Sequence, residues 1–147
     1  MTDKIILLVE DNEDDVLLTK RAFQKNNVKN ELVVVSDGRE ALDWLFSEGE
    51  HAGRDGNVQP ELILLDVNMP RMGGLEVLER VRADPRTEFV PVVMLTSSKQ
   101  EEDLIRSYEL GANSYVRKPV AFEAFVNAVR TLGVYWLVLN ERARRST

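Results

Sequence analysis

Residues 62–70, Leu62-Ile63-Leu64-Leu65-Asp66-Val67-Asn68-Met69-Pro70, decide how this chain folds. Four consecutive large aliphatic residues are typical of a central parallel strand that is buried on both faces. Asp66 follows them at once, so the strand delivers a carboxylate to the edge of a sheet, where open α/β folds bind their ligands. Residues 5–9 repeat the arrangement, because they are apolar throughout and Glu10-Asp11 come next. Two buried strands that end in acids predict carboxylates gathered around a cation.

Length and composition exclude several classes of protein. At 147 residues, with 44% hydrophobic and 30% charged residues, the chain is expected to form one domain with a substantial core. A formal net charge of -6 argues against nucleic acid or an anionic membrane as the main partner. The lack of cysteine excludes disulfides and cysteine-ligated zinc, and the single histidine, His51, is expected to be a solvated loop residue. No signal peptide and no apolar stretch approaching the ~20 residues that span a bilayer is present, so we expect a cytoplasmic protein.

Strand-like and helix-like segments alternate along the whole chain, which predicts an α/β fold with a parallel sheet and helices on both faces. The expected strands are residues 4–9, 31–35, 62–66, 90–95 and 114–116. The expected helices are residues 13–25, 37–46, 75–83, 101–110 and 121 to about 140. For five such strands the flavodoxin-like (CheY-like) order 2-1-3-4-5 is the leading choice. We expect a single domain over residues 1–147, with its core at about 4–132, an extended helix to about 140 and a basic tail at 141–147.

The predicted strand order brings acidic residues together. Strands one and three would lie side by side, so Glu10 and Asp11 would meet Asp66. Carboxylates that lie this close repel one another unless a cation joins them. With only oxygen ligands available, the arrangement favours a hard ion such as Mg²⁺, and Mn²⁺ or Ca²⁺ is expected to fit the same oxygens. Asp14 and Asp15 are expected to be no more than the solvated, dipole-favoured start of a helix.

Hydroxyl and ammonium groups follow the two remaining strands of the sheet. Residues 92–95 lead to Thr96-Ser97-Ser98, and residues 115–117 lead to Lys118. A phosphoryl group on Asp66 would need such donors to neutralise its oxygens. Taken alone, Thr96 is more often the cap of a strand end and Lys118 a surface charge. The order of acid, acid, hydroxyl and lysine along strands one, three, four and five favours a phosphoryl site.

With these motifs the chain resembles, over nearly its full length, the receiver domain of two-component response regulators. The resemblance implies that Asp66 takes a phosphoryl group from a phosphohistidine on a sensor histidine kinase. It also implies a Mg²⁺ site made of Glu10, Asp11, Asp66 and the Asn68 carbonyl, and phosphoryl contacts from Thr96, Ser97 and Lys118. The Lys118-Pro119 peptide bond is expected to be cis. The matching segments are Leu7-Leu8-Val9-Glu10-Asp11-Asn12, Leu64-Leu65-Asp66-Val67-Asn68-Met69-Pro70, Gly73-Gly74-Leu75-Glu76, Pro91-Val92-Val93-Met94-Leu95-Thr96-Ser97 and Lys118-Pro119.

The resemblance further implies a conformational switch. Phosphorylation would draw Thr96 toward the phosphoryl group and turn the Tyr115 ring inward, which changes the surface near the fourth helix. The alternative for Tyr115 is an ordinary aromatic residue that packs on its strand. The long polar segment 47–60, together with Thr96-Ser97-Ser98 and the C-terminal pattern, is similar to single-domain regulators that partner phytochrome-type kinases.

The end of the last helix predicts a surface for protein contacts. Its residues Val134-Tyr135-Trp136-Leu137-Val138-Leu139 are apolar on every face, which favours a homodimer; a helix end folded back onto the core is the alternative. No output domain is recognisable in the sequence, so the signal is expected to leave through contacts with an unknown downstream protein. Three arginines in the 141–147 tail are too few to argue nucleic-acid binding.

Two other functions compete with the receiver hypothesis. A phosphatase of the haloacid-dehalogenase type would also use an aspartate, Mg²⁺ and a lysine, but it needs a second aspartate where this chain has Asn68. A binding scaffold that has lost phosphorylation would keep the fold and its partner surface. In the receiver hypothesis the protein is not an enzyme, apart from catalysing transfer to, and hydrolysis from, its own aspartate.

Overall fold

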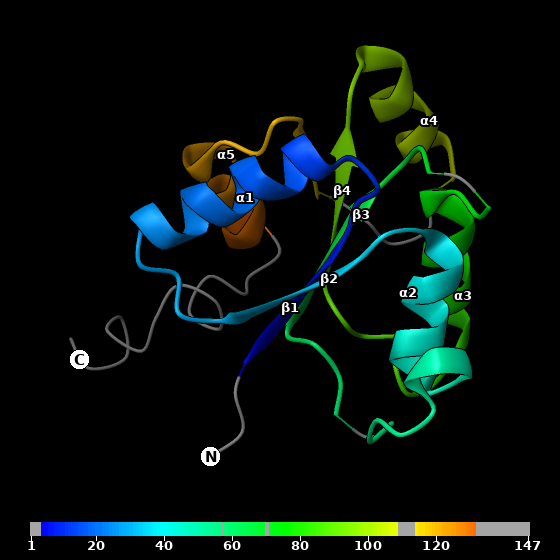
Figure 1. The fold of residues 1–147 in the computed structure, drawn as a ribbon. Helices are drawn as coiled ribbons and strands as arrows, with labels where there is room; N and C mark the ends of the chain where they lie inside the picture. Colours follow the sequence, from blue (N-terminus) through cyan, green and yellow to red (C-terminus); the bar gives the residue numbers. More distant parts are fainter. Residues whose placement is uncertain (1–3, 57, 70, 109–113, 132–147) are drawn as a thin grey trace, which may run out of the picture.

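The computed structural model describes residues 4–56, 58–69, 71–108 and 114–131. They form a parallel sheet of five strands in the order β2-β1-β3-β4-β5, with helices on both faces (Figure 1). The predicted flavodoxin-like order is therefore confirmed. The strands are β1 (Ile5–Val9), β2 (Glu31–Val35), β3 (Leu62–Asp66), β4 (Val92–Thr96) and β5 (Ser114–Arg117). The helices are α1 (Glu13–Lys25), α2 (Gly38–Phe46), α3 (Gly74–Ala83), α4 (Lys99–Tyr108) and α5 (Phe122–Thr131), with a short 3-10 helix, η1 (Gly49–His51), after α2.

Most predicted boundaries agree with the structure within two residues, and the differences have local causes. Strand β4 begins at Val92 because the Val90 N–H donates to the Thr87 carbonyl in a turn, and Pro91 has no N–H to donate. Helix α4 begins at Lys99, two residues before its predicted start; the Ser98 hydroxyl accepts the Glu101 N–H at 3.2 Å and caps it. The predicted end of the fourth helix at residue 110 and the predicted dimer surface at 134–139 lie outside the described residues.

Alternating side chains of the strands build two cores, one on each face of the sheet. Helices α2 and α3 cover one face and α1 and α5 the other (Figure 1). On the second face the Phe23 and Phe125 rings pack with centroids 4.7 Å apart. The first core contains Leu7, Val9, Ile63, Leu65 and Met94, and the second contains Ile6, Leu8, Leu62, Leu64 and Val93. All four aliphatic residues before Asp66 are buried, as a central strand requires.

Glycine allows the loop after β3 to approach its neighbours closely. A Cβ atom on Gly74 would lie 2.2 Å from the Asp66 carbonyl oxygen, and one on Gly38 would lie 2.3 Å from the Met72 carbonyl oxygen. The start of α3 therefore packs directly on the backbone that carries Asp66. Asp37 caps α2 by accepting the Glu40 N–H at 2.8 Å, and it also pairs with Arg71 at 2.6 Å. These contacts fix the loop between Asp66 and α3.

The segment after α2 is bound to that helix by its own side chains. Arg54 Nε donates to the Trp44 carbonyl at 2.7 Å, and its guanidinium lies 3.6 Å from the centroid of the Trp44 ring. Gln59 Nε2 donates to the Leu45 carbonyl at 3.0 Å. His51, expected to be a solvated loop residue, instead lies in η1 with Nε2 3.2 Å from Glu40 Oε2. That expectation was wrong, because η1 folds back along α2.

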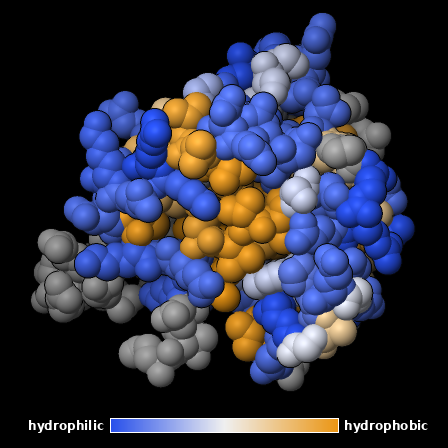
Figure 2. Space-filling view, viewed as in Figure 1, coloured by the Kyte–Doolittle hydropathy of each residue, from blue (hydrophilic) through white to orange (hydrophobic). Residues whose placement is uncertain are grey.

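The surface is polar over most of the helices. In Figure 2 the apolar surface gathers over the middle of the molecule, where Figure 1 shows β2 and β1, with hydrophilic side chains on either side. Within the part of the chain that the structure describes, no helix has the length and apolar composition needed to span a membrane.

Candidate functional site: carboxylates and a lysine at one edge of the sheet

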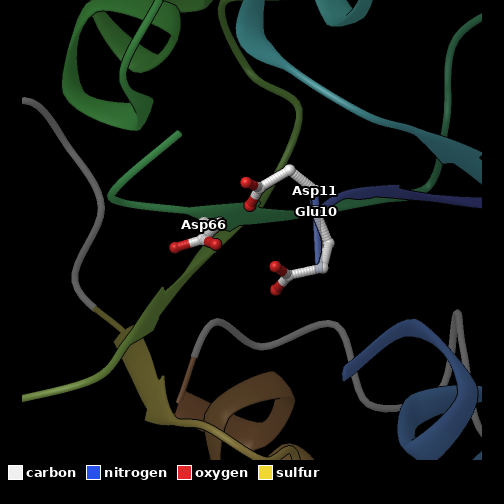
Figure 3. A group of neighbouring side chains, drawn as sticks. All are labelled: Glu10, Asp11 and Asp66. Carbon is white, nitrogen blue, oxygen red and sulfur yellow. The ribbon is translucent and has the colours of Figure 1, made fainter. Parts of the chain in front are cut away.

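The carboxyl ends of β1 and β3 bring three acids together, as the sequence predicted. Val9 pairs with Leu65 in the parallel ladder, so the next residue on each strand, Glu10 and Asp66, emerges at the same edge. Carboxylate oxygens of Glu10, Asp11 and Asp66 all lie within 4.8 Å of one another (Figure 3). Glu10 and Asp66 are almost fully buried, whereas Asp11 is exposed. An all-oxygen cluster that is open on one side fits a hydrated hard cation such as Mg²⁺.

Lys118 is the counterion of this cluster. It follows β5, and its Nζ lies 2.9 Å from Asp66 Oδ2 and 3.3 Å from Glu10 Oε1. Burial alone would lower the pKa of Lys118, but its contacts with Asp66 and Glu10 outweigh burial and raise the pKa above its ordinary value. The ammonium therefore stays charged. The reading of Lys118 as a bare surface charge is excluded, since its side chain is only 13% exposed.

The surroundings of Glu10 disfavour its ionised form. Burial, together with the nearby Asp66 carboxylate, raises its pKa to about 7, although the Asn12 N–H and Lys118 both act to lower it. The Asn12 N–H donates to Glu10 Oε2 at 3.1 Å and fixes the carboxylate. A divalent cation among these acids would relieve the repulsion between Glu10 and Asp66.

Asp15 is a member of the site that the sequence reasoning missed. It was expected to be a solvated helix start, but its Oδ2 lies 3.3 Å from Lys118 Nζ. The Asn12 side chain caps α1 by accepting the Asp15 N–H at 3.0 Å, which sets the orientation of this first turn. Glu13, Asp14 and Asp15 look alike in the sequence, and only the tertiary position of Lys118 distinguishes Asp15 from the other two.

The residues around Asp66 occupy different environments. The Asn68 N–H donates to Asp66 Oδ1 at 3.1 Å, so the loop after β3 turns back over the carboxylate. Thr96 is fully buried at the end of β4, and its Oγ1 donates to Glu102 Oε2 at 3.3 Å. Ser97 is exposed, and its N–H donates to Glu101 Oε1 at 2.7 Å. Tyr115 is partly buried and packs against the core beneath α2 and α3.

Five of the predicted site residues therefore gather at one edge of the sheet. Glu10, Asp11, Asp66, Thr96 and Lys118 all follow or end neighbouring strands at their carboxyl ends. The Lys118-Pro119 peptide bond is cis, as the resemblance implied. The apolar run 134–139 lies outside the described residues. A buried aspartate beside an ammonium and two further acids is an arrangement for phosphoryl transfer to a carboxylate.

The chain is similar to known proteins over most of its length. The sequence pattern described as the response regulator receiver domain matches residues 6–130. Response regulator Rcp1 of Synechocystis sp. (strain ATCC 27184 / PCC 6803 / Kazusa) is 37% identical over 134 residues, which are 91% of this chain and 89% of Rcp1. The crystal structure of its Mn(2+)-bound form has a TM-score of 0.71 at 36% identity and covers 91% of this chain and 94% of that chain.

Two further solved structures come from regulators that are named for phytochromes. The bacteriophytochrome response regulator AtBRR is 49% identical, with a TM-score of 0.88, over 96% of this chain and 100% of that chain. The phosphorylated cyanobacterial phytochrome response regulator RcpA is 39% identical, with a TM-score of 0.73, over 92% of this chain and 95% of that chain.

Proposed function

The chain belongs to the response regulator receiver domain family, and on that premise we propose that Asp66 accepts a phosphoryl group from the phosphohistidine of a sensor histidine kinase. Proteins of this family serve phosphorylation-based signalling. The observation that carries the proposal is the contact of 2.9 Å between Lys118 Nζ and Asp66 Oδ2 within a group of acids. An oxygen of Asp66 attacks phosphorus, and the bond from phosphorus to the kinase histidine breaks.

The chain's own residues prepare Asp66 for this reaction. Lys118 donates to the buried Asp66 carboxylate at 2.9 Å and is close enough to contact a phosphoryl oxygen there. Thr96 and Ser97 would supply further donors to the phosphoryl oxygens. Glu10, Asp11, Asp66 and the Asn68 carbonyl would hold Mg²⁺. The ion would neutralise charge on the phosphoryl oxygens as they approach the acids.

The proposed output is a change in a protein-interaction surface. Thr96 moves toward the phosphoryl group, Tyr115 turns inward, and the surface formed by β4, α4 and β5 changes its contacts. We further propose that residues 134–139 form a homodimer surface, that residues 1–147 act as one domain, and that a downstream protein reads the result. We also propose that the protein acts in the cytoplasm, with neither nucleic acid nor a membrane as a partner.

The phosphodonor that fits this chain best is a phytochrome-type histidine kinase. Support comes from AtBRR and RcpA, two regulators named for phytochromes that match almost the whole chain. The long polar segment 47–60 after α2 adds to this, because it is one of the features by which the sequence resembles regulators that partner phytochrome-type kinases. A kinase of another sensory class is the alternative donor.

The experiment that tests the proposal is intact mass after incubation with acetyl phosphate. We expect a gain of about 80 Da in the presence of Mg²⁺, and no gain in its absence or in Asp66→Asn. Asp103→Asn, which removes an exposed carboxylate on α4, is the matched control and should be phosphorylated like the wild type. Phosphorylation of Asp66→Asn, or no adduct on the wild type with either acetyl phosphate or phosphoramidate, would overturn the proposal.

The choice of kinase needs a separate test. Autophosphorylated bacteriophytochrome kinase and an unrelated sensor kinase, at equal concentrations, are mixed with the protein, and transfer is followed over seconds to minutes. We expect the phytochrome-type kinase to transfer at least about tenfold faster, because paired interfaces discriminate by differences in affinity. Equal rates would leave the phosphoacceptor role intact and remove the phytochrome assignment.

A further inference from the structure

The Glu102 carboxylate accepts a hydrogen bond from the Thr96 hydroxyl, the group proposed to contact a phosphoryl group on Asp66. Glu102 lies in the first turn of α4, with its side chain only 12% exposed, and has no place in the acidic cluster around Asp66. Its Oε2 accepts hydrogen bonds from Thr96 Oγ1 at 3.3 Å and Arg117 Nε at 2.9 Å, and it forms an ion pair with Arg117 Nη2 at 2.9 Å. A single carboxylate oxygen thus joins β4, β5 and the start of α4.

The position of Arg117 explains why a carboxylate is stable there. Thr96 and Arg117 are partners in the parallel ladder between β4 and β5, so they emerge side by side at the edge of the sheet. The Arg117 guanidinium lowers the pKa of Glu102, and the carboxylate stays ionised near neutral pH. A carboxylate at the N-terminal turn of a helix is also favoured by the helix dipole. Glu102 is therefore a charged, oriented acceptor for the Thr96 hydroxyl.

The hydroxyl of threonine carries one proton and can donate to one acceptor at a time. In the unphosphorylated protein that acceptor is Glu102. This inference rests on the proposed phosphorylation of Asp66. After phosphorylation, a phosphoryl oxygen would accept a hydrogen bond from the same Thr96 hydroxyl. We infer that Glu102 is a positioning residue that holds the Thr96 hydroxyl in the resting protein and competes with the phosphoryl group for it.

This competition has two consequences for signalling. Phosphorylation must break the hydrogen bond between Thr96 and Glu102, so the free energy of that hydrogen bond opposes activation. After the bond breaks, Glu102 keeps Arg117 as a partner but loses its link to β4. The Glu102 side chain is then bound to β5 alone, and a contact made inside the site is passed to the outer surface of α4.

The inference is tested with beryllofluoride, a tetrahedral anion that mimics a phosphoryl group on a carboxylate. Affinity for beryllofluoride with Mg²⁺ is measured from the amide shifts of residues next to Asp66 in a nuclear magnetic resonance titration. Hydrogen bonds to charged groups are worth enough that Glu102→Ala should bind beryllofluoride about three- to tenfold more tightly than the wild type. Asp103→Ala, which removes a neighbouring exposed carboxylate that pairs with Lys99, should bind within about twofold of the wild type.

A double-mutant cycle separates the hydrogen bond from a general effect of charge. In a Thr96→Val background there is no hydroxyl for Glu102 to hold, so Glu102→Ala should change the affinity by less than about twofold. An equal gain in both backgrounds would show that Glu102 acts by repelling the anion and would overturn the inference. So would an unchanged affinity in the single variant.

Two further arms keep the result decisive. If Glu102→Ala does not fold, Glu102→Gln is the deciding variant. This neutral acceptor of the same shape should bind beryllofluoride at least about twofold more tightly than the wild type, and an unchanged affinity counts against the inference. Wild-type protein that fails to bind beryllofluoride, with Asp66→Asn giving the same result, would refute the proposed function itself. That outcome is distinct from one in which the wild type binds and the Glu102 variants do not differ from it.

Discussion

Lys118 Nζ lies 2.9 Å from Asp66 Oδ2, although 52 positions separate the two residues in the chain. Each of them follows or ends a strand, and the two acids that follow β1 complete the group only because β1 and β3 are neighbours. The ammonium occupies the space in which positive charge is needed both before and after phosphorylation.

Lys118→Met should raise the affinity for Mg²⁺. Removing an ammonium that lies within 3.3 Å of both Glu10 and Asp66 leaves the cluster more negative, and we expect about three- to tenfold tighter binding at low salt. Isothermal titration calorimetry at pH 8 measures the change. Lys99→Met removes an exposed lysine near the start of α4 and should alter the affinity by less than about twofold. Weaker binding in Lys118→Met would mean that the lysine organises the acids more than it repels the ion.

Glu10→Gln should change how stability depends on pH in the metal-free protein. Burial raises the pKa of Glu10 to about 7, while in the unfolded chain the group titrates near its ordinary value of 4.5. The folded protein therefore binds the extra proton between about pH 4.5 and 7, and the free energy of unfolding falls as pH rises through that window. At pH 8 we expect Glu10→Gln to be more stable than the wild type by about 1–3 kcal/mol.

Urea unfolding in the presence of a chelator, at several pH values from 4.5 to 8, measures this difference. Glu13→Gln removes an exposed acid from the first turn of α1 and should show no such widening with pH. A difference between Glu10→Gln and the wild type that stays constant across the range would contradict the assigned pKa.

Asp37→Asn should weaken the fold at neutral pH and lose its effect in acid. Partial burial opposes ionisation of Asp37, but the Glu40 N–H and the Arg71 guanidinium prevail and lower its pKa below 3.8. The stabilisation is present above about pH 4 and disappears as pH falls through the lowered pKa. Because Arg71 is largely exposed, we expect about 0.5–1 kcal/mol at pH 7, measured by chemical unfolding.

Asparagine keeps the helix cap, so this variant tests the charge alone. Arg71→Gln is expected to lose a similar amount at pH 7, and the double variant should lose little more than either single one. Strictly additive losses would show that the pair does not interact.

Gly74→Ala should be severely destabilising. The new methyl group would lie 2.2 Å from the Asp66 carbonyl oxygen and 2.9 Å from Val67 Cα, both of them backbone atoms that cannot move cheaply. We expect a loss of about 2–3 kcal/mol or more, read from thermal unfolding. Gly53→Ala has open space around the added methyl group and should stay within about 0.5 kcal/mol of the wild type. Equal melting temperatures for the two variants would contradict the close packing of α3 on β3.

The fold and much of the site were predictable from the sequence because both depend on short, strong signals. Buried parallel strands are continuous apolar runs, and each run here ends in the residue that reaches the sheet edge, as Leu65-Asp66 and Leu95-Thr96 show. The adjacency of Glu10 and Asp66 followed from the strand order alone. The bounds of β4 were less accurate, since Val90 is apolar but lies in a turn before Pro91.

What the sequence did not reveal depends on tertiary contacts between side chains. Nothing distinguishes Asp15 from Asp14 in the sequence, yet only Asp15 is placed by the structure beside Lys118. Glu102 appears in the sequence as one of several acids at a helix start, and its contact with Thr96 depends on Arg117 from another strand. His51 had no local signal for its contact with Glu40, because η1 folds back along α2.

The last carbonyl groups of helix α2 need hydrogen-bond donors from outside the helix. The carbonyls of Trp44 and Leu45 are satisfied by Arg54 and Gln59, residues 10 and 14 positions further along the chain. For anyone who builds chimeric regulators, α2 and residues 47–61 are one transplantable unit. A hybrid that joins this helix to a shorter connection would leave two carbonyls without their donors and the Trp44 ring without its guanidinium. Domain boundaries for such grafts belong before Asp37 or after β3.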